Sequence, residues 1–302
     1  MEILIFFSYI FFSLCSILGF GKLFETLFLG KSSEVSAGLT GFFGLFFLST
    51  ISYLTHFFSA HNYTHNLILL FLGLTLFIFF LKKNNFQLSK NYYLIFLLLI
   101  IGIFLAKSHD DFGYYHLPNA LHFSQNKLEF GLGNLNHGFK HHSSIFYLYS
   151  IFFFPLIDFY LINVLNFFFL YFAVIFLFDE ISGDFKKKKF DNSTLLSIIF
   201  LIIFISLFNR IGEYGADITG QLLAGILISL TMNIILRNKI NIQYILIIYG
   251  LVIYLITIKT YFVVYIFLPL VLLIYKKIHN PIRNNQNHDS NGPQTIFHLN
   301  EE

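Results

Sequence analysis

The sequence has few charged residues, a single cysteine and no tryptophan. Only 12% of its 302 residues are charged, whereas a soluble domain typically carries about 25%. The lone cysteine, Cys15, excludes a disulfide framework and a thiolate metal site. The net charge of +3 comes from so few basic residues that nucleic-acid binding is not indicated. What remains is a chain that is 56% hydrophobic, which is too much apolar surface for a water-soluble fold.

The apolar residues come in long blocks and lack the amphipathic pattern of a helix on a water-soluble surface. Blocks of roughly 15 to 25 residues can cross a bilayer as helices. The first block has no basic residue before Lys22, so we expect an anchored span and not a cleaved signal. The sequence predicts an all-α fold, a polytopic transmembrane helical bundle of about nine spans. The predicted spans lie near residues 1–20, 38–58, 66–81, 91–106, 159–178, 194–208, 218–236, 241–258 and 260–275.

Basic residues cluster between the predicted spans, and short basic segments stay on the cytoplasmic side. The clusters share one side only if residues 144–157 do not cross the membrane. That stretch is short and ends near Pro155 and Asp158, so we expect a helix that lies in the membrane interface. The clusters are Lys82, Lys83 and Lys90, then Lys186 to Lys189, then Arg237 and Lys239, then Lys276, Lys277 and Arg283. The external face then receives residues 59–65, 107–158 and 209–217 and Lys259.

One transmembrane domain is expected over residues 1–277, with a large external loop at 107–158 that carries interfacial juxtamembrane helices. Residues 278–302 are polar and contain Pro and Gly, which predicts a disordered tail. We expect a multi-pass protein of the bacterial cytoplasmic membrane with the external loop outside.

The most informative polar stretch is residues 107–118, KSHDDFGYYHLP, at the external end of the fourth predicted span. Two adjacent carboxylates, Asp110 and Asp111, repel each other, so the pair could hold or accept a proton near working pH. A solvated helix end with a capping aspartate explains the same residues about equally well. Pro118 predicts the first turn of a helix that lies along the membrane.

Half of the 12 histidines fall in the external loop. They lack the fixed spacing of a zinc motif, and histidines at a membrane interface are usually only polar. A divalent cation could assist the carboxylates, but the sequence requires none, so the metal content is unknown. The six histidines are His109, His116, His122, His137, His141 and His142.

Two further polar signals are predicted on the external face. Arg210 and Asp217 stand immediately before a span, where an ionisable side chain needs a partner. A short hydrophilic turn with internal ion pairing is the simpler interpretation. Lys259 interrupts a long apolar stretch, so its ammonium must either extend outward to water or meet an anion.

Taken together, these features resemble the GT-C superfamily of membrane glycosyltransferases, which take a sugar from a polyprenyl-phosphate carrier on the non-cytoplasmic face. Members resemble one another in an acidic residue or pair in a large first external loop, followed by juxtamembrane helices. Asp110 and Asp111, followed by residues 114–116 (Tyr-Tyr-His), match that loop. The likeness continues in residues 214–217 (Tyr-Gly-Ala-Asp) and 259–260 (Lys-Thr), and it covers roughly residues 90–275.

The resemblance implies an inverting enzyme that transfers a hexosyl or pentosyl group from a lipid-linked donor to a glycan, lipid or protein acceptor of the cell envelope. Asp110 or Asp111 would be the catalytic base. The substrate-binding residues would be Lys259 and Arg210 for the departing phosphate, and Tyr115, His116 and Asp217 for the sugar hydroxyls.

The chain also departs from that superfamily. More predicted spans precede the acidic loop than the one that members often have, and fewer spans follow it, so we expect a shortened member. A transporter or flippase for a polar or lipid-linked solute is the competing class, with the acidic pair and Lys259 binding cargo or protons. An inactive remnant is the third reading. A transporter would favour ionisable or interrupted positions near the middle of spans, together with paired repeats, and neither is evident.

Overall fold

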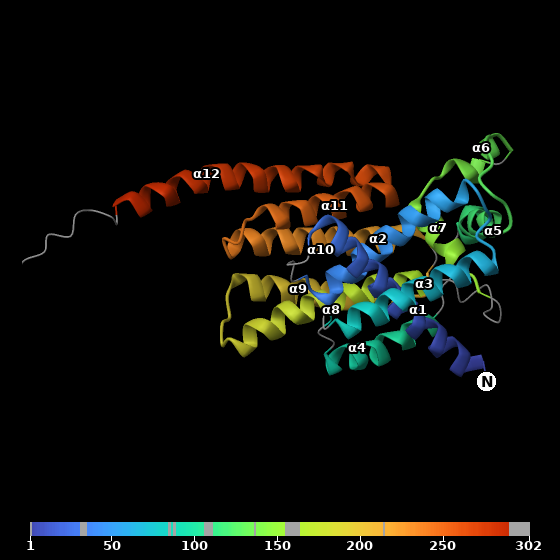
Figure 1. Ribbon diagram of the computed structural model, residues 1–302, viewed down its shortest axis with the longest axis horizontal. Coiled ribbons are helices and arrows are strands. Elements are labelled where there is room, and N and C mark those ends of the chain that lie inside the picture. The colour runs from blue at the N-terminus through green and yellow to red at the C-terminus, as the bar shows by residue number, and fades with distance from the viewer. Residues whose placement is uncertain are drawn as a thin grey trace, which may run out of the picture.

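Long apolar helices run side by side through the computed structural model and enclose its hydrophobic core (Figure 1). The structure describes residues 2–30, 35–83, 86, 89–105, 111–135, 137–154, 164–213 and 215–289. These residues contain helices and no strand, in agreement with the predicted all-α class. The long helices are α1 (Glu2–Phe28), α2 (Ala37–His56), α3 (Tyr63–Lys82), α4 (Lys90–Ile100), α8 (Val164–Lys186), α9 (Asn192–Ser206), α10 (Ala216–Leu236), α11 (Ile242–Ile258) and α12 (Phe267–Asp289).

Shorter helical elements connect the long ones. They are the 3-10 turns η1 (Ile101–Phe104), η3 (His137–Lys140), η5 (Phe208–Arg210) and η6 (Thr260–Ile266), the π-helical turn η2 (Phe112–His116), and the helices α5 (Leu117–Gln125), α6 (Leu132–Leu135) and α7 (Ser144–Ile151). Pro118 lies in the first turn of α5, as the sequence predicted. Figure 1 shows α5, α6 and α7 gathered at one end of the bundle, which we call the loop end. The α8–α9 turn lies at the other, which we call the turn end.

Six of the described segments are long and apolar enough to cross a membrane. Three shorter apolar helices, Lys90–Phe104, Asn192–Ser206 and Ile242–Ile258, account for the other three predicted spans. Helices therefore occur where all nine spans were predicted, but length and composition support six of them. These helices are compatible with a multi-pass membrane protein. The six segments are Ile3–Phe28, Ala37–His56, Tyr63–Lys82, Val164–Lys186, Ala216–Leu236 and Thr260–Ile278.

Polar residues in the connections set where several helices begin. The Asn62 side chain accepts a hydrogen bond from the backbone N–H of His65 (3.0 Å), which starts α3. Asn241 caps α11 through the N–H of Tyr244 (2.8 Å). Each cap satisfies one of the backbone N–H groups that a helix start leaves without a partner.

Glycines allow α1 to approach α2 and α3 closely. A Cβ atom at Gly44 would lie only 2.0 Å from the carbonyl oxygen of Ile17, and one at Gly19 would lie 2.1 Å from that of Gly73. Backbone carbonyls cannot move aside without moving the whole helix. Small residues at these crossings are typical of helix packing in membranes, where close van der Waals contact stabilises association.

Replacement of Gly44 by alanine is expected to destabilise the protein by about 1–3 kcal/mol, because the added methyl group forces α1 and α2 apart. Thermal unfolding in detergent, followed by circular dichroism, measures the effect. Gly183→Ala on α8 is the matched control, since a Cβ there meets nothing within 4 Å. An equal melting temperature for the two variants would contradict this account of the α1–α2 crossing.

The helix within residues 144–157, which we expected in the membrane interface, is buried within the protein. Its side chains from Ile145 to Ile151 are buried, and it packs against α2 and α5. The Ser143 hydroxyl, just before it, donates to the carbonyl of Ile258 (2.7 Å) at the end of α11. At eight residues α7 is too short to span a bilayer, so its apolar composition reflects burial inside the loop end.

The last helix is longer than the sequence suggested. α12 continues to Asp289, whereas we expected disorder from residue 278 onward. A helix that is already formed gains one hydrogen bond for each residue it adds, so a polar sequence can extend it beyond the apolar segment. Residues 290–302 of the predicted tail lie outside the described residues.

Candidate functional site

Three segments that are far apart in the sequence meet at the loop end and bring polar side chains together. They are η2 with the residue before it, the start of α10, and the turn between α11 and η6. We call the group Asp111, Tyr115, His116, Asp217 and Lys259 the loop-end site. Asp110 and Tyr214 lie outside the described residues.

Asp111 lies immediately before η2, and Tyr115 lies one turn later, within it. The Tyr115 hydroxyl donates to Oδ2 of Asp111 at 3.2 Å. Burial, together with the nearby carboxylates of Asp111 and Asp217, which disfavour a phenolate, raises the pKa of Tyr115 to about 12. The hydroxyl of Tyr115 is therefore a stable hydrogen-bond donor at neutral pH, beside two acidic groups.

Asp217 and Lys259 form an ion pair that joins the start of α10 to the end of α11. The Asp217 side chain is 44% exposed and that of Lys259 is 29% exposed, so the pair opens to the outside of the protein. The Lys259 ammonium also lies 5.8 Å from the ring centre of Tyr261. Lys259 has met an anion within its own chain, which is one of the two outcomes expected for it.

Arg210 has a partner in its own turn. Its guanidinium binds Glu213 through Nε at 2.9 Å and through Nη2 at 2.8 Å. The hydrogen bond to Glu213 raises the pKa of Arg210, and the charge of Asp217 adds to the effect, so Arg210 lies within electrostatic reach of the loop-end site. The internal ion pairing expected for residues 209–217 is present. Asn166 of α8 fixes the turn by donating to the carbonyl of Glu213 at 2.5 Å.

Gly215 and Tyr149 position the start of α10. Gly215 has φ 142°, a conformation that L side chains rarely adopt, and a Cβ there would meet the His116 ring at 3.1 Å. The Gly215 N–H donates to the Tyr149 hydroxyl (3.1 Å), which in turn donates to the Gly215 carbonyl (3.4 Å). The buried ring of His116 packs between Gly215 and Phe146 of α7, at 5.6 Å from the Phe146 ring centre. α7 is thus the support on which η2 and α10 meet.

Loss of the Tyr149 hydroxyl is expected to lower the free energy of unfolding by about 1–3 kcal/mol, because two polar backbone groups of Gly215 lose their buried partner. Tyr149→Phe removes only that oxygen. Chemical denaturation in mixed micelles gives the change in stability. Tyr53→Phe on α2, where the side chain is 48% exposed, is the control and should stay within about 0.5 kcal/mol of the parent. A Tyr149→Phe variant as stable as this control would exclude the supporting role.

The described histidines of the external loop do not converge on a metal site. No group of three or more His, Cys, Asp or Glu side chains within the described ranges is arranged to hold a metal ion. His122 lies 3.4 Å from Glu129, and His141 packs 4.9 Å from the Tyr115 ring, so both have structural neighbours. His109 and Asp110 lie outside the described residues.

A second group of histidines lies around the connection between α2 and α3, and the sequence did not predict a role for them. His61 is fully buried, with Nδ1 at 2.6 Å from the Ser150 hydroxyl and Nε2 at 3.0 Å from the Ser52 carbonyl. Burial, with His65 and His56 nearby, lowers the pKa of His61 to about 3, so the ring is neutral at physiological pH. It joins α7 to α2.

The sequence therefore predicted side chains that lie close together in the structure, but not the buried residues that position the segments carrying them. Tyr149, Asn166 and Ser143 sit in or beside apolar runs, and nothing in the sequence links them to segments between 47 and 115 residues away. An isolated polar residue in an apolar block was the available signal, because such a group needs a partner.

The sequence profile of one protein family, described as "Domain of unknown function (DUF8201)", matches residues 1–286. No curated protein and no solved structure matches the chain.

Proposed function

The chain belongs to the family described as Domain of unknown function (DUF8201), and we propose that it is an integral membrane glycosyltransferase that takes a sugar from a polyprenyl-phosphate carrier. The observation that carries the proposal is the loop-end site. An exposed acid–base and cation group, drawn from segments around residues 111, 217 and 259, sits at one end of a bundle of apolar helices. A substrate with a lipid tail and a polar head could reach both environments at once.

The proposed reaction is an inverting transfer. Asp111, or its neighbour Asp110, accepts the proton of an acceptor hydroxyl, whose oxygen forms a bond to the anomeric carbon. The bond between that carbon and the phosphate oxygen breaks, and polyprenyl phosphate leaves with the bonding electrons. The hydrogen bond that the Tyr115 hydroxyl donates to Asp111 (3.2 Å) would hold the carboxylate in one orientation.

Lys259 is the proposed partner of the departing phosphate. Its present partner, Asp217, is half exposed, and the singly charged phosphodiester of an incoming donor, which becomes a dianion as it departs, would compete with that carboxylate for the ammonium. Asp217 would then be free to accept hydrogen bonds from the sugar. Arg210, held by Glu213, would contribute through its charge at longer range.

A transporter is less well supported by the distribution of charge. In the six candidate spans, the described Asp, Glu, Lys and Arg side chains lie within about two helical turns of a span end. A central pathway for a polar solute would need such groups near the middle. The loop-end site instead favours chemistry at one surface.

The test is a transfer assay with the purified protein in liposomes. A mixed pool of labelled polyprenyl-phosphate sugars and a crude envelope extract are supplied as donors and acceptors. The proposal expects label to leave the lipid fraction and appear in the acceptor. Correctly inserted protein that leaves every donor intact would contradict it, and solute uptake would be measured next.

A further inference from the structure

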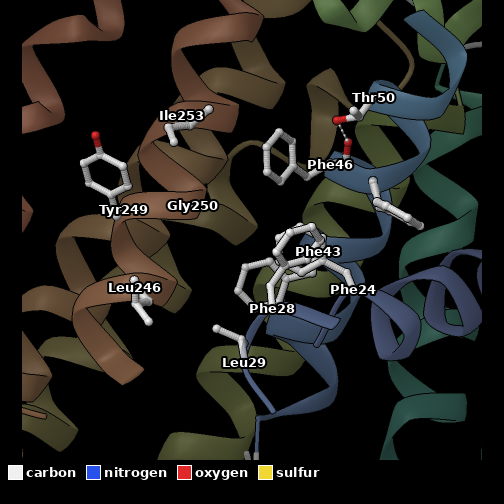
Figure 2. Close-up of a pocket in the computed structure, with 11 residues that line it drawn as sticks. Phe24, Phe28, Leu29, Phe43, Phe46, Thr50, Leu246, Tyr249, Gly250 and Ile253 are labelled. Carbon is white, nitrogen blue, oxygen red and sulfur yellow. Dashed lines mark hydrogen bonds between the residues drawn. The ribbon is translucent and has the colours of Figure 1, made fainter. Parts of the chain in front are cut away.

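A groove in the apolar part of the bundle has no role in the loop-end site. It has a volume of about 360 Å³ and lies between α1 and α2 on one side and α11 on the other (Figure 2). Figure 2 shows phenylalanine rings of α1 and α2 facing the backbone of α11 across the gap. The lining residues are Phe24, Phe28, Leu29, Phe43, Phe46, Phe47, Thr50, Leu246, Tyr249, Gly250 and Ile253.

The lining offers a ligand almost no hydrogen-bonding groups. The Thr50 hydroxyl already donates to the carbonyl of Phe46 at 3.0 Å, within its own helix. Tyr249, 48% exposed, carries the other hydroxyl. A polar occupant would lose its hydrogen bonds with water and gain few in return, so the groove suits a hydrocarbon.

The size of the groove distinguishes a flexible chain from a helix. An α-helix about 10 Å wide that rises 1.5 Å per residue fills roughly 120 Å³ per residue, so the groove would hold about three residues. A groove that takes about one helical turn matches a single polymethylene chain better than a whole helix of a second copy or of a partner protein.

The position of the groove indicates which end of the bundle the chain enters from. Leu29 follows the last residue of α1, and Leu246 lies in the first third of α11, so the groove extends toward the turn end. Along α11, at 1.5 Å per residue, Lys259 lies roughly 20 Å from Leu246 and roughly 9 Å from Ile253, the lining residue of α11 nearest to it. The groove therefore ends short of the loop-end site.

The turn end also carries basic side chains. They are Lys82 and Lys83 at the end of α3, Lys90 at the start of α4, Lys186 to Lys189 from the end of α8 onward, and Lys239 between α10 and α11. Lysines at this level attract anionic headgroups to the leaflet that faces them. We propose that the groove seats one acyl chain of a phospholipid from the leaflet at the turn end, and that this lipid fills the gap between α2 and α11.

Gly250 provides the test. A Cβ at this position would have Phe43 Cε1 as its nearest neighbour, at 4.0 Å, which is ordinary van der Waals contact. Gly250→Leu would therefore put a side chain into the groove without a backbone clash, and leucine is a better helix former than glycine. Gly183→Leu is the matched control, since it adds the same side chain where nothing lies within 4 Å.

The experiment measures the phospholipid that stays with the full chain after detergent purification, by organic extraction and mass spectrometry. Parent protein and Gly183→Leu are expected to retain roughly one phospholipid per chain, and Gly250→Leu to retain several-fold less. Circular dichroism and size exclusion check that each variant is folded. If Gly250→Leu does not fold, Ile253→Phe, which narrows the groove from its rim, replaces it.

Three results would overturn the proposal. The first is equal phospholipid in the parent and the folded groove variant. The second is a retained molecule that is a polyprenyl lipid. The third is a dimer that dissociates in Gly250→Leu, which would mean that a second copy covers the groove.

Discussion

Replacement of Asp111 by asparagine is expected to reduce sugar transfer by about two to four orders of magnitude, the usual contribution of a general base. Asparagine keeps an oxygen that can accept the 3.2 Å hydrogen bond from Tyr115, so η2 should retain its shape. The loss should appear in kcat, with KM little changed, because the carboxylate acts on the proton that moves in the transition state. Initial rates of label transfer in liposomes give both constants.

Glu129→Gln is the control for this variant. Glu129 belongs to the same external loop, and its substitution removes the same negative charge. Its side chain is 51% exposed, and its described ionic neighbour is His122. Its rate should stay within a factor of about two of the parent. Asp110→Asn is measured in parallel. If both single aspartate variants transfer sugar at the parental rate, neither carboxylate is the base.

Removal of the Arg237 side chain is expected to lower the free energy of unfolding by about 3–5 kcal/mol, since it leaves one buried and one partly buried carboxylate without a counter-charge. Arg237 follows α10 at the turn end and binds Glu180 (2.8 Å) and Asp184 (2.6 Å) of α8. The Asp184 side chain is only 8% exposed, and Thr194 of α9 donates to it at 2.7 Å. One guanidinium therefore links α8 and α10, and through Asp184 it also links α9.

Denaturation of Arg237→Ala in micelles measures this loss. Lys239→Ala is the control, because Lys239 is an exposed cation two residues away and its removal should cost no more than about 0.5 kcal/mol. Arg237→Lys should fall between the two, since an ammonium cannot bind both carboxylates with the fork of a guanidinium. Equal stability of Arg237→Ala and Lys239→Ala would show that the packing of α8, α9 and α10 does not depend on the Arg237 guanidinium.

Arg237 also illustrates what the sequence could predict. Its position after an apolar run correctly indicated a helix end, because long apolar blocks bounded by polar residues are a local signal. We interpreted its charge only as an orientation signal. Its partners Glu180 and Asp184 are 57 and 53 residues earlier, and which helices lie side by side is not encoded in local composition.

In the loop-end site, too, the residues could be predicted from the sequence but their contacts could not. Asp111, Tyr115, Asp217 and Lys259 were selected as polar residues at one predicted face, and alternating spans bring that face together. The pairing of Lys259 with Asp217 was not predicted, because it depends on how α10 and α11 pack. For residues 144–157 the sequence predicted a helix that does not cross the bilayer, but it did not predict that this helix is buried, since an apolar stretch too short to cross a bilayer can be buried as readily as it can face the interface.

The most direct test of the central claim is the stoichiometry of the reaction at the loop-end site. Parent protein is given a doubly labelled polyprenyl-phosphate sugar, with one label on the lipid and another on the sugar. The account predicts that one polyprenyl phosphate is released for each sugar transferred, and that both products disappear together in Asp111→Asn. Sugar that crosses the membrane still attached to its lipid, at the same rate in both proteins, would contradict it.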